Sequence, residues 1–161
     1  RCSNNYGPYQ FPEKMIPLMI NNAVNEKPLP VYGNGLNVRD WIHVDDHCRA
    51  LWLVLTKAEP GQIFNIGANN EKTNLEVVKK ILKQLGKSET LITFVTDRPG
   101  HDKRYAIDNT KITAKLGWKP TINFDQGLAD TIQWYKENNQ WLKNVVSGDY
   151  KNYYKKMYVN R

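Results

Sequence analysis

Apolar residues that recur at helical spacing predict several amphipathic helices. The clearest repeat places Leu75, Val78, Leu82 and Leu85 on one face. Asn74 is the expected N-cap of this helix, and Gly86 is its expected end. Similar patterns predict helices over residues 16–26, 110–116, 124–136 and, in the tail, 150–158. Another helix is expected to begin with Asp45 or Asp46 as its N-cap and to bury Ala50, Leu51, Val54 and Leu55.

Short apolar runs between turn residues predict strands. They cover residues 30–32, 38–44, 63–66 and 91–95, with a brief extended piece over 105–107. Another strand is expected to end in the first residues, before the turn at Gly7 and Pro8. Strands and helices roughly alternate, so the predicted fold class is α/β.

Composition narrows the functional classes. The chain has 161 residues, of which 40% are hydrophobic and 24% charged, and this is typical of one soluble domain. It has no apolar run of the roughly 20 residues that a membrane span needs, so we expect a cytoplasmic protein without membrane contact. Cys2 and Cys48 lack metal-ligand spacing; we expect two reduced thiols and no metal site, with a lone disulfide as the alternative.

The net charge of +7 is compatible with a nucleic-acid surface or with a small anionic substrate. Apart from a cluster at Lys151, Lys155 and Lys156, the basic residues are spread among the predicted helices. Spread charge is typical of a solvated surface, so we expect no nucleic-acid partner.

Arg39 lies in a predicted strand between apolar neighbours, where a buried guanidinium needs an anionic partner. Its planar fork suits a diphosphate. Pairing with Asp40, Asp45 or Asp46 explains the same residue equally well.

The loop DRPGHDKR, residues 97–104, is the second candidate anion site. Proline and glycine restrict the loop, and Arg98, His101 and Lys103 could converge on phosphate. A charged surface turn is an equally good interpretation. The turn Gly33-Asn34-Gly35 is not a dinucleotide fingerprint, because Val38 replaces the third glycine and no glycine-anchored helix follows.

The opening pattern R-x-S-N-x-Y-G-P-x-x-x-P-E-K resembles that of the extended short-chain dehydrogenases/reductases that act on nucleotide sugars. RPGHD at residues 98–102, followed by RYAID at 104–108, resembles the dTDP-glucose 4,6-dehydratase branch of that family. The resemblance implies that residues 1–161 form one nucleotide-sugar-binding, carboxy-terminal domain with a few elements of a Rossmann sheet. The NAD-binding part would then be absent from this chain, which starts at Arg1 inside an expected core strand.

The resemblance also implies a set of site residues. Arg39 and the 98–101 loop would hold the substrate diphosphate, Pro30-Val31-Tyr32 would lie along the thymine, and Asn5 would approach the nicotinamide of NAD. Asn74 would reach the substrate, although a plain N-cap explains it too, and core packing explains Met15 and Val31. The implied substrate-binding residues are Asn4, Lys14, Met15, Pro30, Val31, Tyr32, Arg39, Asn74, Arg98, His101 and Tyr158.

Catalytic residues are not expected in this chain. The family's Tyr-x-x-x-Lys pair is absent, since no tyrosine is followed four positions later by lysine. In the intact enzyme, the resemblance implies an NAD-dependent homodimer that converts dTDP-glucose to dTDP-4-keto-6-deoxyglucose and water; the chain alone should not turn over. The alternatives are a UDP-sugar epimerase or decarboxylase, which the RPGHD loop argues against, a non-catalytic nucleotide-sugar-binding module, and a basic nucleic-acid-binding domain.

Overall fold

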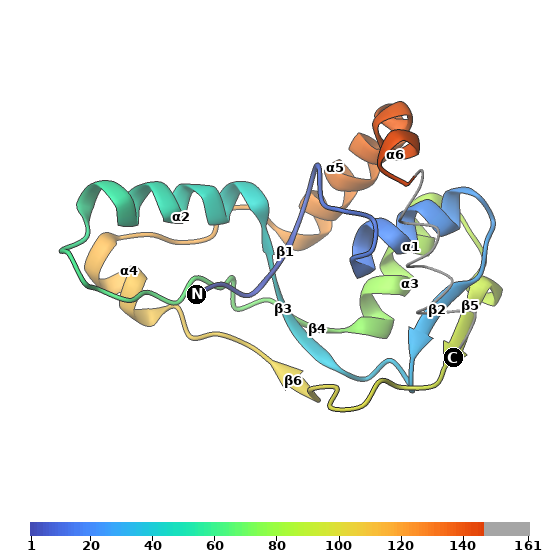
Figure 1. The fold of residues 1–161 in the computed structure, drawn as a ribbon, viewed down its shortest axis with the longest axis horizontal. Coiled ribbons are helices and arrows are strands. Elements are labelled where there is room, and N and C mark those ends of the chain that lie inside the picture. Colours follow the sequence, from blue (N-terminus) through green and yellow to red (C-terminus); the bar gives the residue numbers. More distant parts are fainter. Residues whose placement is uncertain (147–161) are drawn as a thin grey trace.

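Strand β3 (Val38–His43) runs through the middle of the molecule and connects its two halves (Figure 1). The computed structural model describes residues 1–146. Strand β1 (Asn4–Tyr6) pairs in parallel with the second half of β3, with Asn4 opposite Trp41. The first half of β3 pairs with β4 (Glu71–Thr73), which is antiparallel, and with β6 (Arg104–Tyr105), which is parallel. The expected α/β class is confirmed.

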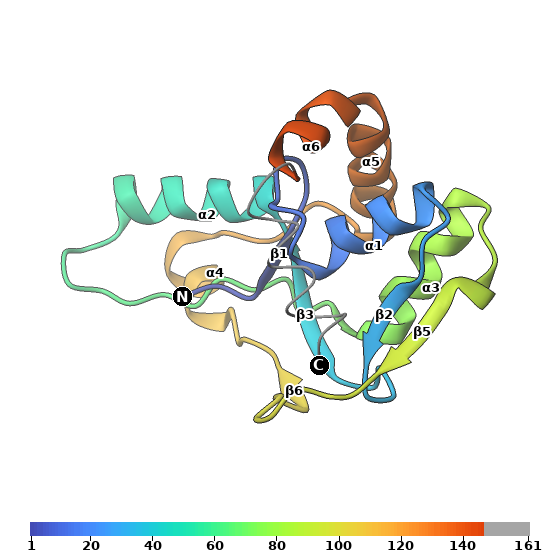
Figure 2. The same ribbon diagram turned by 45° about the vertical axis from the view of Figure 1, so that its right-hand side comes forward.

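A second, two-stranded parallel sheet lies beside this one. It contains β2 (Leu29–Tyr32) and β5 (Ile92–Val95), which Figure 2 shows side by side. The 3₁₀-helix η1 (Glu89–Leu91) precedes β5. Helices α1 (Met15–Val24) and α3 (Asn74–Leu85) pack against each other next to this sheet. The larger core includes Ile16, Ile20, Leu29, Val78, Ile81 and Leu82.

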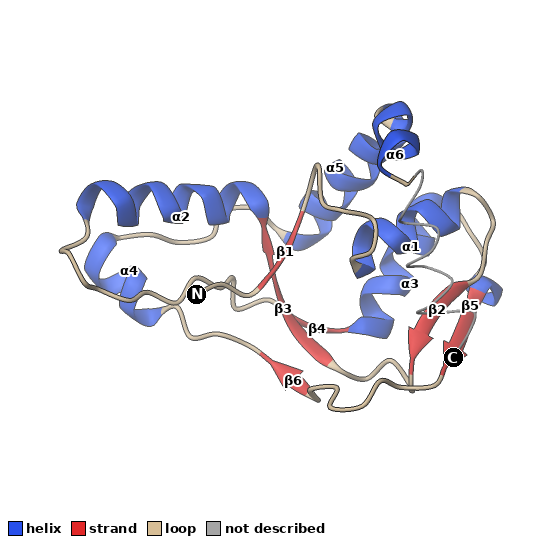
Figure 3. Ribbon diagram, viewed as in Figure 1, coloured by secondary structure: helices blue, strands red, loops and turns tan. Residues whose placement is uncertain are grey.

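A smaller core occupies the other half of the molecule. Helices α2 (Val44–Lys57) and α4 (Thr110–Leu116) enclose it (Figure 3). Its buried members are Ile42, Ala50, Phe64, Ile66, Ile112 and Trp118. The indole Nε1 of Trp118 donates to the carbonyl oxygen of Asp46 at 3.2 Å, which ties the segment after α4 to the first turn of α2.

Helix α5 (Phe124–Glu137) joins the larger core through the face that its sequence predicts. Phe124, Leu128, Ile132 and Tyr135 are all buried. Helix α6 (Asn139–Val145) follows after a single residue, and the sequence pattern did not predict it because only Leu142 is buried.

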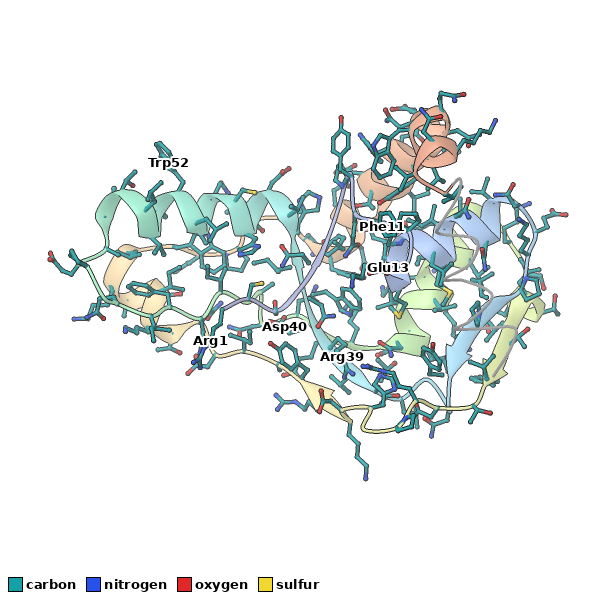
Figure 4. All side chains as sticks on the ribbon, in the orientation of Figure 1. Arg1, Phe11, Glu13, Arg39, Asp40 and Trp52 are labelled. Atoms are coloured by element: carbon teal, nitrogen blue, oxygen red, sulfur yellow. The ribbon has the colours of Figure 1, made fainter. Side chains whose placement is uncertain are left out.

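Helix α2 departs from the prediction in two ways. Its N-cap is His43, whose Nδ1 accepts from the backbone N–H of Asp45 at 3.3 Å, so the expected Asp45 or Asp46 cap is wrong. The expected buried stripe is also wrong in part: Ala50 is buried, but Leu51 and Leu55 are 51% and 78% exposed. Apolar spacing identified an apolar face, but no described element covers it, and Trp52 projects outward from the same helix (Figure 4).

Two further expectations are corrected. Residues 63–66 form no regular strand; Ile66 makes only an isolated bridge to Cys2. Helix α3 is capped by Thr73 and not by Asn74, because the Thr73 hydroxyl accepts from the N–H of Glu76 while the Glu76 carboxylate accepts from the N–H of Thr73. The left-handed Gly86, with φ of 64°, ends α3 as expected.

Among residues 1–146, no helix has the length and apolar character needed to span a membrane. Cys2 and Cys48 are both free thiols in the structure. The predicted tail helix over 150–158 lies outside the described residues.

Candidate functional site

A cavity of about 270 Å³ lies where the two sheets and the first turns of α1 and α3 meet. Its walls come from β1, β2, β3, the two helices and the loop that follows β5. These segments are far apart in sequence, and the sheet pairing brings their polar side chains together. The backbone N–H of Val38 donates to the carbonyl oxygen of Lys103 at 2.8 Å, and this bond fastens the end of loop 97–103 to the start of β3.

Arg39 is a buried cation on this wall, with 8% of its surface exposed. Its Nη1 donates to the carbonyl of Val38 at 2.7 Å, and its Nη2 donates to the carbonyl of Asp102 at 3.0 Å. Burial lowers the pKa of Arg39, the Asp102 carboxylate opposes this shift, and the nearby Arg98 cation adds to it. A buried guanidinium in this setting favours an anionic ligand.

The alternative pairing of Arg39 with a neighbouring carboxylate is wrong. The Asp40 carboxylate accepts from the N–H groups of Ala68 and Asn70, at 3.1 and 2.7 Å. Asp46 is bound to Arg49 and to backbone N–H groups beyond α4. Asp45 lies 3.6 Å from the Nδ1 of His43. Arg39 therefore forms no ion pair with any of the three.

His101 is held in place from two sides. Its Nδ1 lies 2.6 Å from the Oδ1 of Asp97, and its ring meets that of Tyr32 edge to face at 6.0 Å. The hydrogen bond with His101 lowers the pKa of Asp97 below its ordinary value. Only 5% of the His101 side chain is exposed, so the imidazole forms part of the cavity wall.

Gly33 gives this loop the room it needs. The backbone of Gly33 is left-handed, with φ of 56°, and a Cβ built there would lie 3.2 Å from the Oδ2 of Asp97. A side chain at position 33 would therefore be strained and would press on the carboxylate that holds His101. Arg98 is exposed beside it and lines the cavity, whereas Lys103 is not among the lining residues.

The first turn of α1 contributes both charge and apolar surface. Lys14 precedes the helix, and its Nζ lies 2.9 Å from the Oε1 of Glu13. Glu13, labelled in Figure 4, is a carboxylate among the lining residues, which also include the cations Lys14, Arg39 and Arg98. Met15 and Leu18 follow on the same wall. The excess of cations over carboxylates makes the site suited to an anion.

Asn74 is the first residue of α3 and lines the cavity. Its backbone N–H donates to the carbonyl of Asn37 at 3.0 Å. Because Thr73 provides the cap, the Asn74 side chain is not needed for capping. The helix therefore directs its positive end and a side-chain amide at the site.

The structure brings together nearly all residues that the sequence implicated. Ten of the eleven expected substrate-binding residues line the cavity: Asn4, Lys14, Met15, Pro30, Val31, Tyr32, Arg39, Asn74, Arg98 and His101. The eleventh, Tyr158, lies outside the described residues.

Asn5 is not part of this cavity. Successive strand residues face opposite sides of a sheet, so Asn5 points away from the wall that Asn4 occupies. Its Nδ2 donates to the carbonyl of Ser3 at 3.1 Å, and its Oδ1 lies 2.8 Å from the Nδ1 of His47. Burial, followed by the charge of the chain's amino group, lowers the pKa of His47.

Five lining residues were not expected: Glu13, Leu18, Met19, Trp41 and Val78. The apolar ones carry no signal that separates a cavity wall from ordinary core packing. Glu13 could have been found from its place beside Lys14. Trp41 could have been found from strand alternation, since it is two residues from Arg39 on the same face.

The described residues do not form a dinucleotide cradle. The connection from β1 to α1 passes through Gly7 and Pro8 rather than a glycine-rich loop, and Asn5 is already bound to Ser3 and His47. Residues 1–146 therefore present a cavity whose lining suits an anion, and they contain no glycine-rich dinucleotide loop. Within residues 1–146, no three His, Cys, Asp or Glu side chains are placed to bind a metal ion.

The α/β fold and the cavity lined by residues of both sequence motifs, Asn4 and Lys14 from the opening pattern and Arg98 and His101 from the RPGHD loop, point to a nucleotide-sugar enzyme of the extended short-chain dehydrogenase/reductase class. The chain belongs to the GDP-mannose 4,6 dehydratase family, whose model matches residues 1–131. It is 55% identical to dTDP-glucose 4,6-dehydratase of Neisseria meningitidis serogroup B, and the match covers 93% of this chain and 45% of that protein. The chain thus spans about 45% of the length of such relatives.

Solved structures agree with this placement. The dTDP-glucose 4,6-dehydratase of Bacillus anthracis, in complex with NAD, is 56% identical, with a TM-score of 0.86 over 90% of this chain and 46% of that one. The UDP-glucose 4-epimerase of Thermotoga maritima, with UDP-glucose, has a TM-score of 0.82 but only 27% identity, covering 86% and 45%. The fold is shared by both enzymes, whereas the sequence is nearer to the dehydratase. The resemblance to the 4,6-dehydratase branch is confirmed.

Proposed function

We propose that this chain is the nucleotide-sugar-binding part of an NAD-dependent dTDP-glucose 4,6-dehydratase. One observation carries the proposal: ten separately expected residues line a single cavity with an excess of positive charge. A thymidine diphosphate sugar supplies what this wall lacks, namely an anion for Arg39 and Arg98 and a planar base for the β2 wall.

Each part of the cavity has a role in this proposal. Arg39 offers a fixed guanidinium, because two backbone carbonyls already hold its orientation. Arg98 is an exposed cation among the lining residues, and the N-terminus of α3 adds oriented N–H dipoles. Pro30, Val31 and Tyr32 form an apolar wall for the base. The diphosphate would thus lie between β3 and loop 97–103.

In the whole enzyme, we infer that dTDP-glucose becomes dTDP-4-keto-6-deoxyglucose and water. NAD would supply the hydride chemistry and would be bound mainly by residues outside this chain, with Asn5 nearby. The similar Bacillus anthracis enzyme was solved in complex with NAD, which supports NAD as the cofactor of the whole enzyme. The residues of this chain would bind and orient the substrate and shield it from water.

Calorimetric titration of the 161-residue chain with dTDP and, separately, UDP tests the proposal. We expect dTDP to bind more tightly than UDP, and Arg98→Ala to weaken dTDP binding about tenfold, since it removes an ionic contact to phosphate. Arg104→Ala is the matched control. Arg104 pairs with Glu71 at 2.6 Å and does not line the cavity, so its loss should leave affinity unchanged.

Tighter binding of UDP would instead identify an epimerase or decarboxylase of the same superfamily. An absence of binding to either nucleotide would contradict a preformed site in this chain. Equal weakening by Arg98→Ala and Arg104→Ala would point to nonspecific charge attraction, and raising the salt concentration would abolish such binding.

A further inference from the structure

Trp41 has a buried hydrogen-bond donor without a partner. Only 4% of the residue is exposed, and its indole Nε1 has no hydrogen-bond partner within residues 1–146. Such an orphan is uncommon, because burying an N–H without an acceptor is costly. Ser3 Oγ and Gln10 Oε1 share this condition, but of the three residues only Trp41 lines the cavity.

The fold places Trp41 between two expected ligand contacts. It lies two residues after Arg39 on the same face of β3, about 7 Å further along the strand. Its partner across the sheet is Asn4, which also lines the cavity. Arg39 marks the diphosphate end of the proposed site and Asn4 the sugar end, so Trp41 lies at the start of the sugar end.

We propose that the indole N–H of Trp41 donates a hydrogen bond to an oxygen of the hexose in the nucleotide sugar. This inference rests on the proposed function and assigns a specificity-determining residue to the same site. A hexose presents hydroxyl and ring oxygens as acceptors. An indole has one N–H donor and no acceptor, so in this hydrogen bond Trp41 donates and the sugar oxygen accepts. The sugar oxygen would accept from an N–H that has no acceptor within residues 1–146.

A site that hydrogen-bonds a ligand discriminates strongly against a ligand that lacks the acceptor. Trp41 would therefore favour the nucleotide sugar over the bare nucleoside diphosphate. The aromatic body of Trp41 would meanwhile remain part of the core, next to Val78.

The test compares dTDP with dTDP-glucose on Trp41→Phe and on the unmodified chain. The substitution keeps an aromatic ring and deletes the N–H. We expect dTDP-glucose affinity to fall about fivefold, the effect of one neutral hydrogen bond, and dTDP affinity to stay the same. Trp118→Phe is the matched control: it is equally buried, but its N–H already donates to Asp46 and it lies outside the cavity.

Nuclear magnetic resonance gives a second measurement that does not depend on the variant folding. The chain has five tryptophans, so an amide spectrum contains five indole signals. The Trp41 signal is assigned by its loss in Trp41→Phe, or by elimination with the other four Trp→Phe variants. We expect it to move downfield with dTDP-glucose and to shift little with dTDP.

The outcomes separate this inference from the proposed function. If dTDP binds and the Trp41 indole signal shifts no more with dTDP-glucose than with dTDP, the inference fails while the proposed function stands. If Trp41→Phe weakens dTDP and dTDP-glucose equally, the acceptor is not on the hexose and the inference is again wrong. If neither ligand binds the unmodified chain, the proposed function fails and the inference fails with it.

Discussion

The Nη2 atom of Arg39 donates to the carbonyl oxygen of Asp102 at 3.0 Å, across 63 residues of sequence. The same carbonyl accepts from the Nδ2 of Asn37 at 3.1 Å. These two bonds fasten loop 97–103 to β3 and thereby place Arg98 and His101 at the cavity. Arg39 thus lines the candidate site and also anchors the loop that supplies Arg98 and His101 to it.

Arg39→Lys keeps the charge and loses the planar fork. We expect the free energy of unfolding to fall by about 1–3 kcal/mol, because the carbonyls of Val38 and Asp102 lose charged donors. Nucleotide binding should weaken as well. Urea denaturation and calorimetry measure the two effects. Arg104→Lys, which alters an exposed ion pair, should change stability far less; similar losses in both variants would contradict this account.

Asp46→Asn should be strongly destabilising. Its carboxylate accepts from the N–H groups of Thr121 and Ile122, each at 3.0 Å, and pairs with Arg49. Only 1% of the side chain is exposed. We expect a loss of about 2–4 kcal/mol in urea denaturation. Asp45→Asn is the control. The Asp45 side chain is 71% exposed, so this substitution should lower the free energy of unfolding only slightly.

The Asp46 contribution should also depend on pH. Burial raises the pKa of Asp46, but hydrogen bonds from Ile122, Arg49 and Thr121 outweigh burial and hold the pKa below its ordinary value. A carboxyl of this kind stabilises the fold above its unfolded pKa of about 3.9 and loses that effect as the pH falls through the folded pKa. The stability difference between the unmodified chain and Asp46→Asn should be full at pH 7 and shrink below pH 4. A constant difference across this range would contradict the assignment.

Thr73→Ala should lower stability without changing ligand affinity, and Asn74→Ala should do the reverse. Thr73 caps α3, so its loss should lower the free energy of unfolding by about 1 kcal/mol. Asn74 lies in the cavity, so its loss should weaken dTDP-glucose binding and leave stability nearly unchanged. Thermal denaturation and calorimetry on both variants measure this. If Asn74→Ala were the less stable variant, Asn74 and not Thr73 would be the cap.

Tyr135→Phe should loosen the segment that leads into α1. The Tyr135 hydroxyl donates to the carbonyl of Gln10 at 2.6 Å, and the ring of Tyr9 packs on Trp134 at 4.5 Å. Loss of the hydroxyl should cost about 1 kcal/mol and speed proteolytic cleavage within residues 7–14. Tyr105→Phe, whose hydroxyl lies 3.5 Å from the carbonyl of Cys2, is the control and should not alter cleavage there.

Elements with strong local signals were predictable from sequence. The apolar repeat and Gly86 predict α3, and the apolar face with Phe124, Leu128, Ile132 and Tyr135 predicts α5. Caps were less predictable, because adjacent residues such as Thr73 and Asn74 are both good candidates. The strand predicted over 63–66 was wrong because only Ile66 forms a β-bridge with another segment, and its single bridge to Cys2 does not make a regular strand.

The residues of the candidate site were predictable for a different reason. Their motifs resemble those of a family, so Asn4, Arg39 and His101 could be named without any knowledge of their contacts. Trp41 was missed because it was taken with the apolar strand pattern, and nothing local shows that a buried indole lacks an acceptor.

The sequence by itself determined the α/β class, the positions of most elements, the family and ten of the residues that line the cavity. Hydrophobic periodicity and turn residues are local properties of the chain, so the sequence alone is enough to recognise them. Only the tertiary structure decided that Arg39 binds carbonyls and no carboxylate, that Leu51 and Leu55 are exposed, and that the N–H of Trp41 has no partner within residues 1–146. These facts depend on which distant segments meet, and pairing between β1, β3 and loop 97–103 sets that arrangement.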